Sequence, residues 1–424
     1  MRVAILGNMN NNGFSIMRYF RDIGVDAHLI LYSNDGVGKL NHFTTQNDSF
    51  NIDKWDKFIH KSKIHNGPNH VLPHTIQILL FPFINFIYKI LGREIEIDTL
   101  SKDELHILFN PYDSIITSGY APAILSRINR PVSIFFPYAM GIEGICRLYS
   151  PPLKSFFNRI IFEYARLKQL EGLRQCDFIL NAELGVTKVE LDKRKLKFRN
   201  LAIPMVYDKI NLPKEIEDYD LAGIASELNA CSFSVLMHSS LVWKEESCRK
   251  YRAHSKNNHW VIHGFSELVK ARPYLRTKLI ILEYGPDVEN TKRLICELNI
   301  ADHVMWLKKT SRKNIMWLLQ RVTVACGEFI DIPKTFWGGT GWEVLASGKP
   351  LLQGFNFSDD EFEEHFGYPP PPLLIVNKES DIYFHFNDIC DNPSLVKRIG
   401  EESQKWFKNY NGAAIAKKWL ELIN

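Results

Sequence analysis

The stretch "KTFWGGTGWEVLASGKPLL", residues 334–352, joins a glycine-rich turn to an apolar segment with helical spacing. Its glycines, Gly338, Gly339 and Gly341, let the backbone approach a ligand closely. The first amide groups of a helix have no partner within the helix and lie at the positive end of its dipole. The turn is therefore suited to bind a phosphate or diphosphate.

Two side chains of this stretch add to the expected anion site. The hydroxyl of Thr340 is placed either to cap the helix or to donate to a phosphate oxygen. Glu343 follows in the first helical turn, where its carboxylate can accept two hydrogen bonds from a vicinal diol. A capped helix with an acid in its first turn would show the same pattern, so the surrounding sequence has to decide between the two interpretations.

The surrounding elements alternate between strands and helices. In the second half, strands are expected at 232–240, 277–285, 303–307, 322–329, 350–354 and 373–376, and helices at 259–271, 287–300, 312–321 and in the tail. In the first half, a strand, a glycine-containing loop, a helix and a strand occupy residues 2–32, and further strands are expected at 113–120, 131–138 and 177–182. Residues 201–208 begin with a strand-like stretch that ends in Pro204, where a domain boundary is expected. This alternation indicates parallel sheets covered by helices on both faces.

A chain of 424 residues exceeds what one hydrophobic core usually supports. We expect an amino-terminal Rossmann-like domain over 1–205, with an insertion at about 41–100, and a carboxyl-terminal Rossmann-like domain over 206–405. A last helix, 406–424, is expected to pack back on the first domain. The predicted fold class is therefore α/β, with two doubly wound domains facing a cleft.

Composition excludes several classes of protein. The formal charge of +4 is too small to indicate a nucleic-acid-binding protein. The seven cysteines form no CxxC pair, which favours free thiols in a reducing compartment. The apolar run at the amino terminus is too short for a signal peptide, so we expect a cytoplasmic protein. The sequence contains no HExxH or GxSxG motif and no DxD run next to an expected strand, and the spacing of His238, His254, His259 and His263 does not indicate a metal site.

Residues 71–92 break the α/β pattern. The segment is apolar and aromatic, but it is interrupted by polar residues and by Pro82, which counts against a membrane span. One interpretation is a buried or domain-flanking pair of helices. The other is an interfacial segment that inserts Phe81, Phe83, Phe86 and Tyr88 into the membrane surface, which would make the protein peripheral at the inner face of the membrane.

Residues 235–355 resemble the nucleotide-sugar-binding half of the GT-B glycosyltransferases, above all the retaining family 4. The resemblance rests on the turn at Gly285, on Gly338, and on Glu343 with the residues after it, Ala346, Gly348, Lys349 and Pro350. It implies a metal-independent hexosyltransferase with a UDP- or GDP-linked sugar as donor and no cofactor. The amino-terminal half resembles the family only in the order of its elements.

The resemblance also implies roles for individual residues. Glu343 would hold the ribose hydroxyls and Lys256 the donor diphosphate, with Gly285 at the end of a neighbouring strand. Thr335 stands where the family has the glutamate that contacts the donor sugar, and Glu328 is a candidate to replace it.

Other family positions are also changed in this chain. The arginine that normally follows the first strand of this domain is replaced by Ser239 or Ser240, so Arg252 or Lys244 of the long loop would supply the charge. In the amino-terminal half, Gly13 and the amides of Asn10 to Asn12 would contact donor phosphate or acceptor. Tyr138 and Glu143 are the polar candidates where the family often has a histidine.

The sequence thus predicts a transferase that moves a sugar from a nucleotide sugar to a glycan or lipid-linked acceptor, with retention, in surface polysaccharide or glycoconjugate biosynthesis. Two alternatives stay open. The loss of the first glutamate and of the arginine favours a non-catalytic relative that binds a nucleotide sugar or glycan. A nucleotide-sugar epimerase on the same two-domain fold is the third interpretation.

Overall fold

The computed structural model describes residues 1–35, 44–92, 97–137, 142, 145, 156–180, 186–251, 254–330 and 338–424, without the side chains of 186–188. The chain divides into two compact units, both of them discontinuous in sequence. Unit 1 consists of Met1–Thr45, Asn51–Met205 and Ala413–Asn424, and unit 2 of Gln46–Phe50 and Val206–Gly412.

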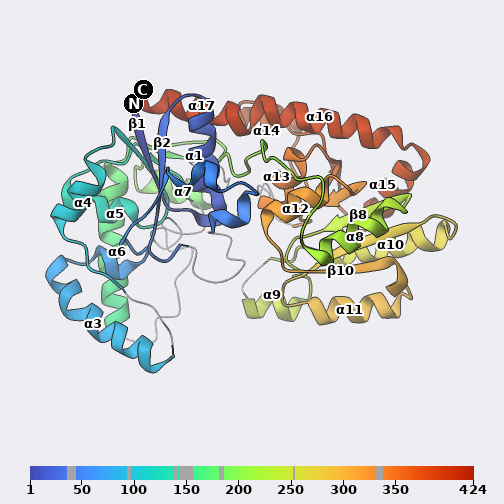
Figure 1. The fold of residues 1–424 in the computed structure, drawn as a ribbon, viewed down its shortest axis with the longest axis horizontal. Helices are drawn as coiled ribbons and strands as arrows, with labels where there is room; N and C mark the ends of the chain where they lie inside the picture. Colours follow the sequence, from blue (N-terminus) through green and yellow to red (C-terminus); the bar gives the residue numbers. More distant parts are fainter. Residues whose placement is uncertain are drawn as a thin grey trace. The chain divides into compact units, whose positions relative to one another are not determined.

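Unit 1 contains a seven-stranded parallel sheet of order β3-β2-β1-β4-β5-β6-β7 (Figure 1). Its strands are β1 (Arg2–Leu6), β2 (Asp26–Leu31), β3 (Ile59–Lys61), β4 (Ser114–Thr117), β5 (Ile134–Phe135), β6 (Phe178–Leu180) and β7 (Phe198–Arg199). Its helices are α1 (Asn12–Asp22), α2 (Asp53–Asp56), α3 (His74–Ile90), α4 (Lys102–Phe109), α5 (Ala121–Leu125), α6 (Phe156–Arg174), α7 (Val186–Lys193) and α17 (Gly412–Ile423), with short 3-10 turns at Met9–Asn11, Pro68–Val71 and Ser126–Ile128. A further 3-10 turn, Thr45–Asp48, begins at the last residue of this segment of unit 1 and continues into unit 2.

Unit 2 contains a six-stranded parallel sheet of order β10-β9-β8-β11-β12-β13. Its strands are β8 (Phe233–Met237), β9 (Thr277–Glu283), β10 (Val304–Lys308), β11 (Val324–Cys326), β12 (Leu351–Gln353) and β13 (Leu374–Ile375). Its helices are α8 (Tyr219–Asn229), α9 (Glu245–Tyr251), α10 (Asn258–Ala271), α11 (Val288–Glu297), α12 (Arg312–Leu319), α13 (Gly339–Ala346), α14 (Asp359–Phe366), α15 (Ser380–Asp391) and α16 (Ser394–Tyr410), with a 3-10 turn at Ala301–His303. The predicted α/β class with two Rossmann-like parallel sheets is confirmed.

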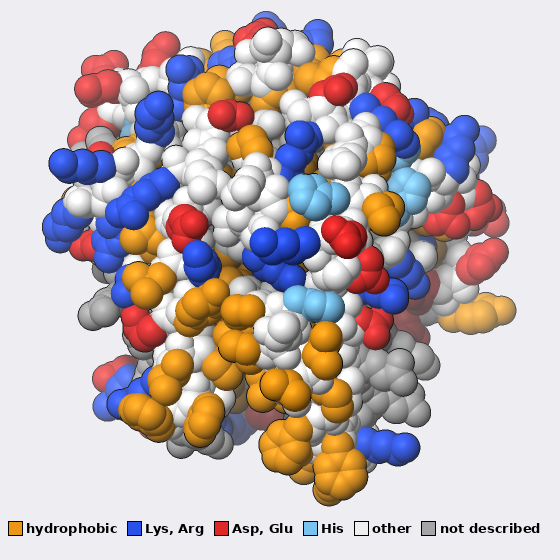
Figure 2. Space-filling view, turned by 90° about the vertical axis from the view of Figure 1, so that its left-hand side faces the viewer, with side chains coloured by type: hydrophobic (Ala, Val, Ile, Leu, Met, Phe, Trp, Pro, Cys, Tyr) orange, Lys and Arg blue, Asp and Glu red, His pale blue; other side chains and the backbone are white. Residues whose placement is uncertain are grey.

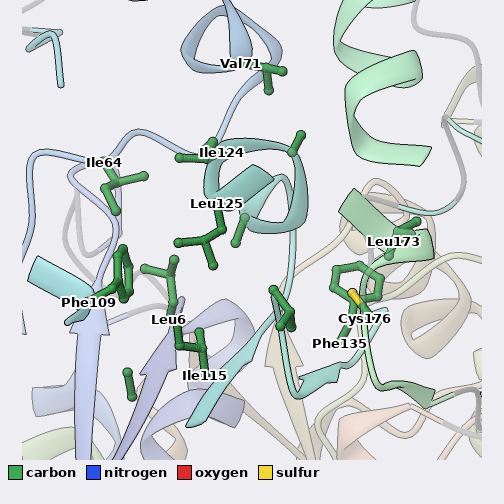
Figure 3. Close-up of a cluster of buried hydrophobic side chains, with 14 of the residues drawn as sticks. Leu6, Ile64, Val71, Phe109, Ile115, Ile124, Leu125, Phe135, Leu173 and Cys176 are labelled. Carbon is green, nitrogen blue, oxygen red and sulfur yellow. The ribbon is translucent and has the colours of Figure 1, made fainter. Parts of the chain in front are cut away.

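The strands are buried because helices cover both faces of each sheet, which explains their nearly continuous apolar sequences. In unit 1, Leu6 and Ile115 of neighbouring strands pack with Phe109 of α4, Leu125 of α5 and Leu173 of α6 in one apolar cluster (Figure 3). The last helix, α17, joins this unit through Trp419, which is fully buried and whose indole Nε1–H donates to the carbonyl of Ala202 at 3.0 Å.

Two expectations about local structure are wrong. Residues 201–208, all of which the structure describes, form no strand, and the last strand of unit 1 is β7, just before them. The helix pair that one interpretation of residues 71–92 expected is instead a single helix, α3, with Pro82 inside it. Among the described residues, no helix is both long enough and apolar enough to cross a membrane.

Candidate functional site

The sheet of unit 2 has one topological switch point, between β8 and β11. From β8 the chain continues to β9 on one side, whereas β11 pairs with β8 on the other, with Val324 opposite Val235 and Cys326 opposite Met237. Ligands of open α/β sheets bind outside the carboxyl ends of the strands at such a point. The loops after β8 and β11 are therefore where a binding site is expected.

An ion pair joins these two loops. Nζ of Lys256 lies 2.5 Å from Oε1 of Glu328, and the two side chains are only 22% and 11% exposed. The backbone of Lys256 ties the loops together as well, because its N–H donates to Val242 at 2.7 Å and its carbonyl accepts from Phe329 at 3.3 Å. Two residues predicted to be catalytic thus meet at the switch point.

The position of Glu328 is fixed by Gln353 at the end of β12. The Gln353 side-chain Oε1 accepts from the backbone N–H of Glu328 at 3.2 Å, and its Nε2 donates to the Glu328 carbonyl. Glycine is needed next to this contact, since a Cβ on Gly327 would lie 1.8 Å from Gln353 Oε1. The side-chain amide of Gln353 thus pairs with the backbone of Glu328 just beyond the end of β11, as a neighbouring strand would. No sequence motif indicated this contact.

The amino terminus of α13 lies beside the same carboxylate. Gly338 is the N-cap residue and offers no side-chain cap, and a Cβ at Gly338 would lie 3.3 Å from Glu328 Oε2. The next helical residues are Gly339, Thr340 and Gly341, as expected from the sequence. Oγ1 of Thr340 is buried and has no hydrogen-bond partner within the described part of the chain. This helix end therefore offers free amides and a hydroxyl next to Lys256.

Glu343 is buried at the centre of a charged network. Its Oε1 accepts from Nε of Arg312 at 2.7 Å and its Oε2 lies 3.0 Å from Nε2 of His238. Arg312 also reaches Oδ1 of Asp48 at 3.3 Å, so that the guanidinium lies between two carboxylates. A carboxylate oxygen has more than one acceptor position, so Glu343 keeps capacity for hydroxyl donors.

The charge of Glu343 is stabilised by these partners. Burial alone raises the pKa of this carboxyl, but the hydrogen bond from His238 and the positive charge of Arg312 outweigh it, and the pKa lies below its usual value. Nδ1 of His238 is buried and lacks a hydrogen-bond partner among the described residues. An ionised acceptor and an unsatisfied ring nitrogen therefore lie together at the end of β8.

The sequence did not point to Arg312, Asp48 or His238 as members of the site. Arg312 starts a helix like many surface arginines, and Asp48 is separated from it by 264 positions. His238 directly follows the first strand of unit 2, which is a position where site residues gather. That placement is the one signal that could have selected it.

The loop after β8 is held by Asp287. This buried carboxylate accepts from the backbone N–H groups of Trp243 at 2.7 Å and Lys244 at 3.0 Å, and from Oγ of Ser247 at 2.6 Å. Burial raises the pKa of the Asp287 carboxyl, but these hydrogen bonds together lower it by more, so the pKa lies below its usual value. Gly285 is required here, since it has φ +121° and a Cβ would lie 2.5 Å from the backbone of Leu241.

Three further residues that were predicted to contact the donor or acceptor lie against other residues of the protein. Oγ of Ser239 accepts from Nδ2 of Asn258 at 3.0 Å, and Nζ of Lys244 lies 4.7 Å from the ring centre of Trp243. In unit 1, Gly13 packs against Gly7, where a Cβ would lie 2.1 Å from the carbonyl oxygen. Packing alone therefore explains why glycine stands at position 13.

Four predicted residues, Thr335, Arg252, Tyr138 and Glu143, lie outside the described residues. Within the described ranges, no group of three or more His, Cys, Asp or Glu side chains is arranged to hold a metal ion.

No protein-family model and no curated protein sequence matches this chain. Solved structures do match over nearly the full length. HepE of Anabaena, in complex with UDP and glucose, has a TM-score of 0.55 at 14% identity, with 99% of this chain and 98% of that chain covered. A glycosyltransferase from Rickettsia africae gives 0.53 at 15% identity, with 100% and 97% covered.

A variant of TarM from S. aureus, in complex with Fondaparinux, alpha-GlcNAc-glycerol and UDP, has a TM-score of 0.55 at 11% identity, with 100% of both chains covered. Identities this low establish the fold alone. The chain thus has the α/β fold of two Rossmann-like units that characterises the GT-B class.

Proposed function

We propose that this protein is a glycosyltransferase that moves a hexose from a UDP- or GDP-linked donor to a glycan or lipid-linked acceptor, with retention. The observation that carries the proposal is the cluster at the switch point of unit 2, where Lys256 and Glu328 meet the amino terminus of α13. A cation, free helix amides and a buried carboxylate one turn further along are the groups that a nucleoside diphosphate requires.

The chemistry follows from where charge develops. When the bond between the anomeric carbon and the diphosphate oxygen breaks, negative charge grows on the departing diphosphate. The ammonium of Lys256 and the amides at Gly339 and Thr340 would stabilise this charge, which is the main contribution that the protein can make to the transition state. The acceptor hydroxyl forms the new bond to the anomeric carbon and gives its proton to the departing diphosphate.

The nucleoside end of the donor would bind at Glu343. Its carboxylate is ionised and oriented by Arg312 and His238, and it can still accept from two neighbouring ribose hydroxyls. A bound donor could also form a hydrogen bond with Nδ1 of His238. Without such a bond this buried nitrogen has lost its contact with water and gained no partner in return. Glu328 stands in our proposal for the sugar-contacting glutamate that Thr335 replaces.

Incubation of the purified full chain with sugar-labelled UDP- and GDP-hexoses tests this function. Release of UDP or GDP together with transfer of label to water or to an added glycan or lipid-linked acceptor supports a transferase, in a pathway of surface polysaccharide or glycoconjugate synthesis. Tight binding without turnover across donors and acceptors would instead establish a non-catalytic relative. Conversion of one nucleotide sugar into another without loss of the nucleotide would establish an epimerase.

A further inference from the structure

Helix α3 of unit 1 turns two of its polar side chains toward the protein and exposes most of its apolar side chains. Gln77 faces the protein, where its Nε2 donates to the carbonyls of His70 at 2.9 Å and Leu72 at 2.7 Å. Asn85 both donates to the carbonyl of Ile97 and accepts from its N–H, at 3.3 and 3.1 Å. These contacts fix the rotation of the helix about its axis, so its outward face is a stable property of the fold.

The outward face of α3 is apolar. It carries exposed Ile76, Leu79, Phe83, Phe86, Ile90 and, just beyond the helix, Leu91, of which Leu79 is 79% and Ile90 68% exposed. At 100° per residue, the exposed apolar side chains from Phe86 round to Leu91 cover about 140° of the helix circumference, and exposed Thr75 and Lys89 lie between this arc and Ile78. Figure 2 shows the hydrophobic side chains gathered on the lower part of this side of unit 1, the height at which α3 lies in Figure 1.

One aromatic residue corrects the sequence-based expectation. Phe81 is 1% exposed and packs its ring 4.6 Å from the ring centre of His70, so it belongs to the protein core and not to the outward face. Phe83 and Phe86 are the outward aromatic residues, and Tyr88 is half-buried. The expected contact surface is therefore carried by aliphatic side chains as much as by aromatic ones.

The charges around this face are basic. Residues 74–92 contain Lys89 and no acid. The first turns of α6 add another exposed apolar group, Phe156, Phe157 and Ile160, interrupted by Asn158 and Arg159. Neither Lys89 nor Arg159 forms an ion pair within the part of the chain that the structure describes, and Glu163, one turn after Arg159 on α6, pairs with Arg166. Unpaired cations beside exposed apolar residues complement an anionic surface.

We propose that α3 docks this protein on an anionic lipid bilayer, with its axis along the membrane surface. A groove on a partner protein covers one stripe of a helix, whereas a bilayer interface surrounds every outward side chain, which fits the wide apolar arc. The free cations at its edge match anionic headgroups. A helix of 17 residues is about 25 Å long and does not have to span the membrane to bind it. This surface belongs to unit 1 and does not depend on the proposed transfer reaction.

Flotation of the full chain with phosphatidylcholine vesicles, with and without phosphatidylglycerol, tests the proposal. We expect the protein to float with the anionic vesicles, and Phe83→Asp combined with Phe86→Asp to lower the bound fraction at least about tenfold. Phe384→Asp on α15 is the matched control, because that phenylalanine is also 67% exposed, and it should bind as the unaltered protein does. Reversal of charge, Lys89→Glu with Arg159→Glu, should weaken binding to anionic vesicles and leave the weak binding to neutral vesicles unchanged.

Three results would overturn the proposal. The first is that the unaltered protein stays at the bottom of the gradient with anionic vesicles. The second is that the double aspartate variant floats as well as the unaltered protein while its melting temperature is unchanged. The third result concerns a second copy of the chain as the occupant. If sedimentation shows a lipid-free dimer that the double aspartate variant dissociates, this face is a protein interface and not a membrane surface.

Discussion

The sheets of the two units have the same strand order, but the loops that follow their first strands carry different side chains. Both sheets follow the order 3-2-1-4 from their first strands, so the loop after β1 in unit 1 corresponds to the loop after β8 in unit 2. The unit 1 loop is short and rich in asparagine: Asn10 and Asn11 adopt left-handed conformations with φ 53° and 58°, and Asn8 Oδ1 accepts from Phe14 at 2.9 Å. The unit 2 loop is long and delivers Lys256 to Glu328.

The charged groups differ in the same way. Next to the unit 1 loop, Asp35 accepts from the backbone N–H groups of Asn8 and Tyr32, both at 3.0 Å, and burial raises its pKa to about 7. In unit 2, Glu343 is kept ionised by Arg312 and His238. A parallel sheet therefore supplies a place for a ligand in each unit, and in our proposal the side chains of unit 2 bind the diphosphate and the diol.

The largest effect on turnover is expected from the substitution of Lys256, which tests the difference between the two units. Lys256→Ala removes the one cation at the amino terminus of α13 that the described residues show pairing with Glu328. We expect turnover to fall about 100-fold or more, the usual loss when a group that stabilises developing charge is removed. Steady-state kinetics measure this loss, and thermal unfolding should change by much less.

Two further variants show whether that effect belongs to the site. Lys292→Ala removes a comparable pair, in which Nζ lies 2.6 Å from Glu283, and it should leave turnover unchanged. Glu328→Gln keeps Lys256 but frees it from its partner, so affinity for UDP should rise while turnover falls. A Lys256→Ala enzyme with normal turnover and reduced stability would make the lysine structural.

The second effect concerns the ribose contact. Glu343→Ala should weaken UDP binding about tenfold to 100-fold, because two hydrogen bonds to a charged acceptor are lost. The variant should also lose the preference for UDP over an analogue that lacks both ribose hydroxyls. Titration calorimetry with the two nucleotides measures this.

The matched control for this variant is Glu379→Ala. Glu379 also pairs with a histidine, since its Oε1 lies 2.5 Å from Nδ1 of His263, but it is exposed and lies on another element. It should bind both nucleotides as the unaltered protein does. If Glu343→Ala still prefers UDP to the analogue by the same factor, the ribose assignment is wrong.

The smallest expected effect is in unit 1, at Asp35. Its pKa is 3.8 when unperturbed and about 7 in the folded chain, so between these values only the folded state holds the proton. Stability should therefore fall as pH rises from about 4 to about 7, since the native state then has to release a proton that it binds well. Asp35→Asn removes this term and should be more stable than the unaltered protein at pH 8, by about 1–2 kcal/mol.

Urea unfolding at a series of pH values measures the difference, which should vanish near pH 4. Nucleotide affinity should be unchanged in Asp35→Asn. A variant with lower UDP affinity would give the unit 1 loop a role in donor binding and would contradict the contrast between the two units.

The fold could be predicted because its signals are local. Short apolar runs bounded by glycine and proline gave the positions of β1, β2, β4, β8, β9 and β12, and helical spacing gave α10, α11 and α12. The strand-like stretch expected before Pro204 forms no strand, because buried apolar residues in a connection between elements show the same composition as a strand. The glycines at the start of α13 could be placed because a helix that begins in glycines has a recognisable sequence.

The partners within the site could not be predicted in this way. The contacts of Arg312 with Glu343 and Asp48, and of Gln353 with the backbone of Glu328, join residues on different elements. No sequence spacing encodes such contacts, since they depend on how strands order themselves in the sheet. The roles of Lys256, Glu328 and Glu343 stay predictions until the variants are measured.

The membership of Asp48 in unit 2 limits how this protein can be divided or recombined. Arg312 and Lys313 both contact the Gln46–Phe50 segment, through the carboxylate of Asp48 and the carbonyl of Ser49 at 3.3 Å each. A fragment that starts at residue 206 would leave a buried guanidinium without one of its two counter-charges. An exchange of nucleotide-binding halves between relatives would therefore have to carry this short amino-terminal segment along, and a single crossover point would not suffice.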